Sequence, residues 1–560
     1  MITLGGSLIA GGLYNFVDAL TGIADPSLAI NGYTFDNWTS IHPLLDISKQ
    51  MSSWDSASGG TDWMIANGHV DASTGWITST TLPGFFWKSL VPQGADTFLM
   101  GKQYRMQWTG AGTMVLGSGG TTDSTSANEV LFTVTGNFIQ VRATSGPITG
   151  LTIVDVDHTA RYDAGERIDP DYAALIADVR EMRFMDWGLT NTTTQTNWAS
   201  RPVVAQNSYA PSGYGDDLVN SAGVPLSLMV MLSNKIKADM WFCFPHAADD
   251  TYMTNAATYV RDNLDPDLTC KYEVSNEVWN DGFWVQGNYL TSLGKTLWPA
   301  AVGSESDTSF RLSAHSYRTY QMANIIDAVY SGILSRRGIV LNVQTDFFAR
   351  GVYQMDAPVW EDYHDSAGSL SDAYVTPSSV LTHMALTSYF GGGLLTSSRQ
   401  TEIAADYNSD PATSDATIEG YLRATGQSTG SINDVGAAWS AYNAEAITRG
   451  LKMCLYEGGP HMVQGGSQNV DAVAACNHWL DGSYGTAFAN DIYHLWQTFS
   501  EAEAPFMQFQ DVGARSGYGT WSIWEHMDDT PTGYMGRLLD RNASEGNWWG
   551  DTTDHRHGAI

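Results

Sequence analysis

Two glutamates stand where apolar runs of the chain end. Glu277 lies in "KYEVSNEVWN", residues 271–280, directly after Asn276. Glu457 lies in "MCLYEGGPH", residues 453–461, directly before two glycines. Two carboxyl groups that face each other can divide acid and base chemistry between them when their surroundings push their pKa values apart. The fold must bring the two glutamates together for this to happen.

The chemistry that suits such a pair is glycosidic bond cleavage with retention of configuration. One carboxyl group protonates the leaving oxygen, while the other, about 5 to 5.5 Å away, attacks the anomeric carbon. The amide of Asn276 could bind the sugar 2-hydroxyl, a contact that strengthens in the transition state. Gly458 and Gly459 would let the backbone approach a ligand closely.

The segments that must position these residues alternate between strand and helix patterns from about Asp163 onward. Alternation of this kind predicts an α/β fold with a parallel sheet. One helix pattern, "GAAWSAYNAEAITRG", ends in Gly450, which suits a C-cap. Seven apolar segments have the length of strands: 181–187, 238–246, 270–277, 338–347, 383–390, 451–459 and 504–512.

An eight-stranded (β/α)8 barrel needs one further strand, and "AINGYTFDNW" at 29–38 is the candidate. Residues from roughly 60 to 160 read instead as short alternating strands with Gly, Ser and Thr turns, which indicates a small antiparallel β-sandwich. The sandwich is either an insertion after the first barrel strand, or an N-terminal domain with 151–157 as that first strand.

The expected organisation therefore has five parts. They are an N-terminal arm at 1–28, the first barrel strand region at 29–59, the β-sandwich at 60–160, the barrel at 161–541 and a C-terminal tail at 542–560. In a barrel of this type chemistry sits at the carboxyl ends of the strands. Glu277 then ends strand four and Glu457 ends strand seven, so that their side chains can face each other across the mouth.

These motifs resemble clan A of the glycoside hydrolases, the retaining (β/α)8 enzymes. The resemblance rests on Asn276–Glu277 in "EVSNEVWN", on the second glutamate in "LYEGG" and on Tyr389 in "ALTSYFGG", and it covers about 380 residues. It implies that Glu277 is the acid/base and Glu457 the nucleophile. It also implies that Tyr389 donates a hydrogen bond to the nucleophile.

The resemblance suggests further substrate-binding residues. Trp521 or Trp524, in "YGTWSIWEH", would form the floor of the sugar site, and Arg183 in "MRFMDW" would lie near the nucleophile. Asp186 ends the same segment as Arg183 and is a candidate beside it. His246, after the third strand, and His461, after Glu457, complete the set of expected site residues.

Composition excludes several classes of function. The 560 residues carry a formal charge of -32, which argues against a nucleic-acid partner. No apolar run is long enough for a membrane helix. Patterns for a zinc site, a nucleotide cofactor or a GxSxG hydrolase are absent, so we expect neither metal nor cofactor. The four cysteines, three of them in apolar runs, indicate buried free thiols.

The leading hypothesis is a retaining, endo-acting glycosidase whose partner is a polysaccharide or oligosaccharide. The alternative is a non-catalytic carbohydrate-binding or virion structural protein on the same fold. The first residues, "MITLGGSLIAGG", make a poor signal peptide. Two extracellular settings therefore stay open, a secreted enzyme shown without its leader and a phage particle that degrades a surface glycan.

Overall fold

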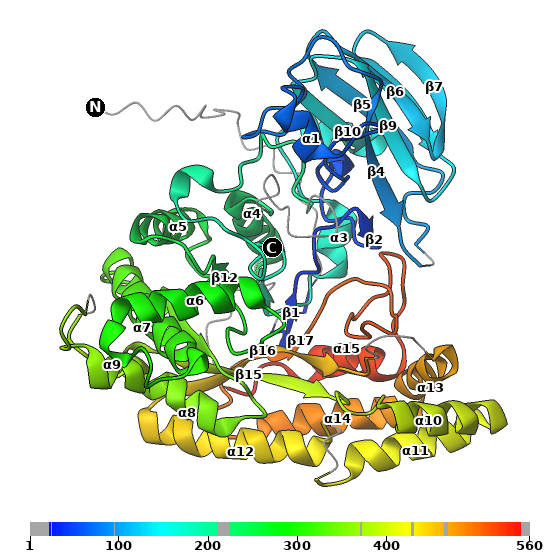
Figure 1. Cartoon of the computed structure of the whole chain (residues 1–560). Helices are drawn as coiled ribbons and strands as arrows, with labels where there is room; N and C mark the ends of the chain where they lie inside the picture. Colours follow the sequence, from blue (N-terminus) through cyan, green and yellow to red (C-terminus); the bar gives the residue numbers. More distant parts are fainter. Residues whose placement is uncertain are drawn as a thin grey trace.

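The structure is a computed structural model that describes residues 22–23, 25–94, 96–210, 223–369, 372–426, 430–463 and 469–549. Its centre is a sheet of eight strands that are all parallel (Figure 1). In chain order the strands are β1 Leu28–Asn31, β11 Glu181–Arg183, β12 Asp239–Phe244, β13 Cys270–Val274, β14 Arg337–Asn342, β15 His383–Phe390, β16 Lys452–Pro460 and β17 Phe506–Gln508.

The sheet curls into a nearly closed barrel. β1 pairs with β11 on one side and with β17 on the other, so the first strand lies between the second and the last. The two remaining edges, β16 and β17, also meet, because the Phe509 N–H donates to the Gly458 carbonyl at 2.8 Å. This arrangement is that of a TIM barrel, with strands four and seven formed by β13 and β16.

Helices cover the outside of the barrel, and those that follow β15 and β16 form a broad layer beneath it in Figure 1. The expected helix before β16 is α12, Ile432–Arg449, and its end is set by Gly450 at φ +69°, a left-handed cap that glycine adopts without a Cβ clash. The helices of the barrel region are α2 Thr159–Asp163, α3 Pro170–Leu175, α4 Leu226–Ile236, α5 Asp250–Asn263, α6 Trp284–Leu297, α7 Asp307–Val329, α8 Phe348–Asp356, α9 Pro358–Tyr363, α10 Ser397–Ser409, α11 Pro411–Arg423, α13 Val470–Asp481, α14 Ser483–Gln497 and α15 Gly533–Glu545.

The barrel interior holds charged side chains from β11 and β13 in two layers. In the lower layer Lys271 Nζ donates to Glu181 Oε2 at 2.6 Å. In the upper layer, two residues further along each strand, Arg183 pairs with Glu273, and both side chains are fully buried. Residues at i and i+2 of a strand share a face, so this alternation directs both pairs inward.

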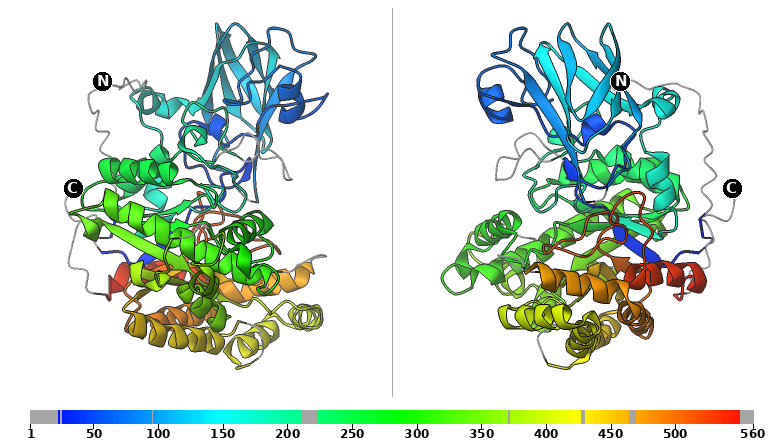
Figure 2. Two further views of the ribbon diagram at one scale, coloured as in Figure 1. Left: turned by 60° about the vertical axis from the view of Figure 1, so that its left-hand side comes forward. Right: turned by 90° about the vertical axis from the view of Figure 1, so that its right-hand side faces the viewer.

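Two smaller sheets lie between β1 and β11 in the chain and stand together at one end of the molecule (Figures 1 and 2). One has the order β10-β5-β8-β7, and the other has the order β2-β4-β9-β6 with β3 also on β4. Every pair is antiparallel except β2–β4. The elements are β2 Trp38–Thr39, β3 Asp55–Ser56, α1 Thr61–Ala66, β4 Phe86–Pro92, β5 Gln103–Thr109, β6 Thr113–Ser118, β7 Gly120–Ser126, β8 Glu129–Val134, β9 Ile139–Ser145 and β10 Gly150–Asp155.

Some boundaries differ from the expected ones. Because β10 pairs with β5, residues 151–157 do not form the first barrel strand, which is β1. The region 29–59 contributes β2 and β3 to the small sheets as well as β1 to the barrel. α15 continues past residue 541, and the side chain of Asn542 accepts hydrogen bonds from the Ser27 and Leu28 N–H groups. Most of the expected N-terminal arm lies outside the described residues, as do residues 550–560 of the expected tail.

Two sequence-based expectations concern the chain as a whole. All four cysteines are free and buried, which confirms the prediction. None of the described helices is long and apolar enough to cross a membrane.

Candidate active site

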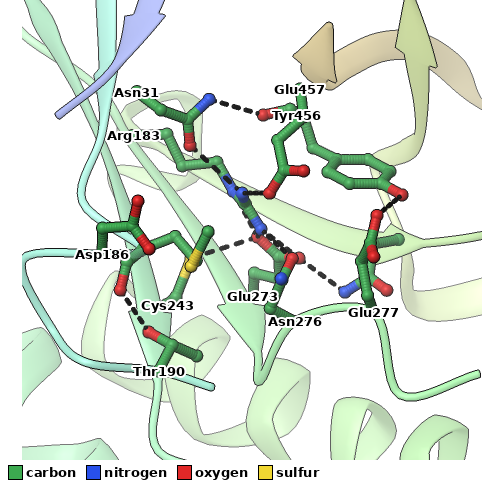
Figure 3. Close-up of polar contacts among 12 residues, drawn as sticks. Asn31, Arg183, Asp186, Thr190, Cys243, Glu273, Asn276, Glu277, Tyr456 and Glu457 are labelled. Carbon is green, nitrogen blue, oxygen red and sulfur yellow. Dashed lines mark hydrogen bonds and ion pairs between the residues drawn. The ribbon is translucent and has the colours of Figure 1, made fainter. Parts of the chain in front are cut away.

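Glu277 lies on the tight turn that follows β13. Ser275 and Glu277 both have left-handed backbone conformations, with φ values of +62° and +38°. Residues other than glycine rarely adopt such conformations. The turn leaves Glu277 partly exposed at the mouth. Asn280 Nδ2 donates to Glu277 Oε2 at 2.9 Å, and the Tyr456 hydroxyl donates to Oε1 at 2.9 Å. These two neutral donors hold the carboxyl group in place, and Figure 3 shows the bond from Tyr456.

Glu457 lies inside β16 rather than at its end, since the strand continues to Pro460. The pairing of β15 with β16 skips one residue, so that Leu386 lies opposite Leu455 and Thr387 opposite Glu457. Tyr456 is therefore the extra residue of a β-bulge, a feature that re-aims side chains. The bulge explains how two consecutive residues, Tyr456 and Glu457, can both reach the active-site side of the barrel.

Arg183 is the central cation of the site and is fully buried. Nε and Nη2 donate to the two oxygens of Glu273 at 3.0 Å, and Nη2 also donates to Asn276 Oδ1 at 2.9 Å. Nη1 donates to Glu457 Oε1 at 2.9 Å and to Asn31 Oδ1 at 3.2 Å. A guanidinium has five N–H groups, so these contacts engage all of them. The arginine thus joins β1, β11, β13 and β16 around one charge.

Glu273 is a site residue that the sequence reasoning missed. Besides the two bonds from Arg183, it accepts hydrogen bonds from Trp241 Nε1 at 2.8 Å, Cys243 Sγ at 3.2 Å and Asn342 Nδ2 at 2.5 Å. The signal was present: Lys271 and Glu273 alternate with apolar residues in β13, as expected for charged groups that face a barrel interior. Glu273 pairs with the arginine and holds its side chain in place.

Asn276 is oriented from both ends of its amide. Its Oδ1 accepts from Arg183, and its Nδ2 donates to Asn191 Oδ1 at 3.1 Å. Asn191 also accepts from Gln286 Nε2 at 3.0 Å. A primary amide has two N–H groups, and the bond to Asn191 uses one of those of Asn276.

The electrostatics of the two glutamates are linked. Burial raises the pKa of Glu277, and burial together with the charge of Glu277 raises the pKa of Glu457. When one of two such carboxyl groups is ionised, its charge disfavours ionisation of the other. Arg183 at 2.9 Å and the Tyr389 hydroxyl, which donates to Glu457 Oε2 at 3.0 Å, both favour a charge on Glu457. Glu457 thus has a cationic donor, whereas the two donors to Glu277 are neutral.

Asp186 adds a third carboxyl group. It lies three residues after β11, and Gln510 Nε2 donates to its Oδ2 at 3.3 Å. Burial raises the pKa of Asp186 to about 6. Its negative charge raises the pKa of Glu457 further, which places Asp186 within electrostatic reach of that residue.

Aromatic side chains form a wall beside Glu457. The rings of His461 and Trp521 stack with centroids 5.4 Å apart, and Trp521 Nε1 donates to His461 Nδ1 at 3.2 Å. The ring centroid of Tyr389 lies 5.1 Å from that of His461 and 6.2 Å from that of Phe509. Phe509, directly after β17, was not among the expected site residues, although its position at a strand end was a signal.

Two expected residues lie apart from this cluster. Trp524 is 5% exposed, and its backbone pairs with Val512, so it packs inside the loop that carries Trp521. His246 is buried after β12, with its ring 5.0 Å from that of Tyr289 on α6. Burial lowers the pKa of His246 to about 4, so it is uncharged near neutral pH.

Gly458 and Gly459 are packed tightly against the neighbouring strands. A Cβ on Gly458 would meet Ser388 Oγ at 1.6 Å, and a Cβ on Gly459 would meet Gln508 Nε2 at 2.2 Å. The space that glycine leaves is filled by side chains of the neighbouring strands β15 and β17. The two glycines allow the seventh strand, β16, to fit closely between β15 and β17.

The described part of the chain contains no group of three or more His, Cys, Asp or Glu side chains that could hold a metal ion.

Comparison with solved structures found distant similarities. No family model and no curated protein matches the chain. Among solved structures, a GH51 arabinofuranosidase from Xanthomonas axonopodis pv. citri is 10% identical over 62% of this chain, with a TM-score of 0.32, and the match spans 60% of that protein. Fungal β-1,4-galactanases are 10% identical over 66% of this chain and 91% of theirs, with a TM-score of 0.35.

A Ruminococcus gnavus β-glucuronidase is also 10% identical, over 90% of this chain and 99% of its own, with a TM-score of 0.26. All three similar proteins are named as glycosidases. The scores are too low to carry an argument about activity, so that argument depends on the residues of the site.

Proposed function

We propose that this protein is a retaining glycoside hydrolase that cleaves O-glycosidic bonds in a polysaccharide by double displacement. The observation that carries the proposal is the coupled pair of glutamates on strands four and seven, with Arg183 and Tyr389 bound to one of them. This asymmetry supplies what the chemistry needs, a protonated acid beside an ionised nucleophile.

In the first step Glu457 attacks the anomeric carbon while Glu277 gives its proton to the leaving oxygen. The glycosidic C–O bond breaks, a glycosyl ester forms on Glu457, and the leaving sugar departs with the proton as its new hydroxyl group. In the second step Glu277 takes a proton from water, whose oxygen attacks the same carbon. The ester bond breaks, and both glutamates return to their starting states with the configuration retained.

The surrounding residues support these roles. The second amide N–H of Asn276 would bind the sugar 2-hydroxyl, and its orientation by Arg183 and Asn191 limits the entropy lost on binding. The Trp521 ring, stacked on His461, offers an apolar face of the kind that sugar rings cover. Neither His246 nor Trp524 has a role in the proposed mechanism.

The test is reducing-end release from a panel of neutral and acidic polysaccharides by the wild type, Glu277→Gln and Glu457→Gln. Glu305→Gln, on the loop before α7, is the matched control. We expect activity on one glycan that both site variants lose and the control keeps. NMR of the first product formed would then show the original anomer. Activity that survives both site substitutions would overturn the assignment.

The same panel tests the alternative of a non-catalytic binding protein. Glycan binding without cleavage by the wild type, and equally by both glutamine variants, would favour that alternative. Polymer cleavage within chains, seen as a rapid fall in viscosity, would show endo action.

The proposal includes two broader points. The two small sheets would be the layers of an accessory β-sandwich that spans most of residues 38–155, since their inward-facing residues join one hydrophobic core with the barrel. The enzyme would act outside the cell, either secreted or carried by a phage particle. Mass spectrometry of culture supernatants and of purified particles would distinguish these two settings.

A further inference from the structure

The site has one buried cation, and that cation is fully engaged. The five N–H groups of Arg183 are directed to Glu273, Glu457, Asn276 and Asn31, and the side chain has no exposed surface. A ligand that carries a carboxylate could pair with Arg183 only by displacing one of these contacts. Breaking a buried ion pair costs several kcal/mol, so the arginine is not a receptor for an anionic group.

The histidines near the site do not supply positive charge either. Burial lowers the pKa values of both His246 and His461 below the ordinary value, so each is neutral at pH 7. Of the charged side chains that most affect the two glutamates, Arg183 is positive, whereas Glu273 and Asp186 are negative. Among these groups Arg183 is paired with Glu273 and Glu457, so the charge of Asp186 is not balanced by it.

Glu277 and Glu457 react in the proposed mechanism, and Glu273 binds Arg183. The proposed reaction gives no such task to Asp186. Gln510 donates to its Oδ2 at 3.3 Å, Thr34 forms a second side-chain hydrogen bond with it, and the side chain is only partly buried. An ionised carboxylate has about four acceptor positions, so it can accept bonds from neighbouring hydroxyl groups of a sugar. The same carboxylate would repel a second carboxylate or a sulfate held at that distance.

We propose that Asp186 sets the charge specificity of the site, by binding hydroxyl groups of the sugar held between Glu277 and Glu457 and by excluding sugars that carry an acidic group there. The substrate class is then a polysaccharide whose cleaved unit is neutral. This inference rests on the proposed function and restricts it, because it rules out uronic acids and sulfated sugars at the position of cleavage.

The test uses pairs of 4-nitrophenyl glycosides that differ in one group, namely glucoside with glucuronide and galactoside with galacturonide, each as both anomers. Like charges brought together in a desolvated site cost several kcal/mol. We therefore expect the wild type to show a kcat/KM at least ~100-fold higher for the neutral member of any pair that it hydrolyses. Asp186→Asn should reduce this ratio by about tenfold or more. Asp346→Asn, which removes a carboxylate after β14 on the same rim, should leave the ratio unchanged.

A second readout distinguishes charge exclusion from a structural effect. Because the pKa of Asp186 is about 6, its charge is lost below that pH, and the wild type should discriminate less against the uronides at pH 5 than at pH 7.5. The titratable groups that interact electrostatically with Asp186 are Arg183 from β11, Glu457 from β16 and Tyr389 from β15, and its neutral hydrogen-bond partners are Thr34 and Gln510. Removing the Asp186 charge lowers the pKa of Glu457, so the acidic limb of the kcat/KM profile should move to lower pH in Asp186→Asn.

The outcomes separate the two proposals. Hydrolysis of a uronide as fast as its neutral partner, or an unchanged ratio in Asp186→Asn, would overturn the inference while the hydrolase proposal stands. If Asp186→Asn loses all activity, the wild-type measurement decides. Equal discrimination against the uronides at pH 5 and pH 7.5 would then also overturn the inference. If the wild type cleaves none of the glycosides and none of the polysaccharides of the panel, both the proposed function and this inference are overturned.

Discussion

Tyr456 donates its hydroxyl group to Glu277 at 2.9 Å, and the residue that follows it in the chain is Glu457. One short piece of the seventh strand therefore supplies both the proposed nucleophile and the donor that holds the proposed acid. The bulge opposite Leu386 and Thr387 makes this possible, because consecutive residues of a regular strand point to opposite faces. A displacement of this segment would disturb both carboxyl groups together.

The two tyrosine hydroxyls should affect opposite limbs of the pH–rate profile. The Tyr456 hydrogen bond lowers the pKa of Glu277, so Tyr456→Phe should raise it and move the basic limb to higher pH. The Tyr389 hydrogen bond lowers the pKa of Glu457, so Tyr389→Phe should move the acidic limb to higher pH. A hydrogen bond to a carboxyl group contributes about 1.5 kcal/mol, so its loss should lower kcat/KM by about tenfold.

The matched control is Tyr534→Phe, since the Tyr534 hydroxyl is buried and has no hydrogen-bond partner among the described residues. Its profile should coincide with that of the wild type. If both site variants shifted the same limb of the profile, the assignment of one tyrosine to each glutamate would be contradicted.

Arg183→Met should destabilise the protein strongly, because it leaves the Glu273 carboxylate buried without its cation. We expect a loss of ~3–5 kcal/mol in the free energy of unfolding, measured by urea denaturation. Arg105→Met is the control, since its ion pair with Asp163 lies at the surface and should contribute no more than about 1 kcal/mol.

If the Arg183→Met protein does not fold, the double variant Arg183→Met/Glu273→Gln decides the question. Removing both charges should restore part of the lost stability, because the uncompensated carboxylate is gone. A double variant that also fails to fold would show that the arginine acts through packing instead.

Gly459→Ala should destabilise the seventh strand. The backbone at Gly459 has φ +117°, and an added Cβ would lie 2.2 Å from Gln508 Nε2. We expect a cost of about 1–3 kcal/mol, with a lower thermal midpoint. In Gly420→Ala, on the exposed face of α11, a new Cβ meets no atom within 4 Å, and the change should raise the midpoint slightly. Equal effects of the two substitutions would contradict the role given to Gly459.

The stability of the protein should fall as pH rises from 4 to 8. Burial raises the pKa of Asp511 to about 7, above its ordinary value of 3.8. A carboxyl group of this kind stabilises the folded state below its ordinary pKa and loses that contribution as pH rises through the folded value. The shift corresponds to as much as ~4 kcal/mol at pH 8.

Asp511→Asn removes this ionisation while keeping a group that can bond to Tyr172, so it should flatten the pH dependence of the free energy of unfolding. The exposed Asp267→Asn should keep the slope of the wild type. The slopes are obtained from urea denaturation at four or five pH values. A slope unchanged by Asp511→Asn would show that Asp511 is already charged in the folded protein at acidic pH.

The sequence was informative wherever a periodic pattern or a strand end carried the signal. Apolar runs of strand length predicted the strands of the barrel, and the positions of Glu277 and Glu457 after such runs predicted that they lie on strands four and seven. Arg183 and Tyr389, expected through the family resemblance, both contact Glu457 in the structure. Their catalytic roles stay predictions.

Other parts of the site could not be predicted because they depend on local irregularities or on long-range pairing. The bulge at Tyr456 changes which face a residue occupies, and no periodicity predicts it. Glu273 looked like one charge in an apolar strand until the barrel placed it opposite Arg183. Trp521 and Trp524 are three residues apart in one loop, and only the loop conformation separates the ring beside His461 from the ring in the core.

The position of β1 has a consequence for how the molecule is assembled. Its partners are β11, beginning at Glu181, and β17, beginning at Phe506, and its backbone is also held by Asn542. During synthesis the first strand emerges early, yet both of its neighbours are made later, one of them near the end of the chain. Contacts of such large sequence separation form slowly, because the intervening chain must first be ordered. Closure of the ring is therefore a late event, and a chain truncated before β17 would expose both edges of an open sheet.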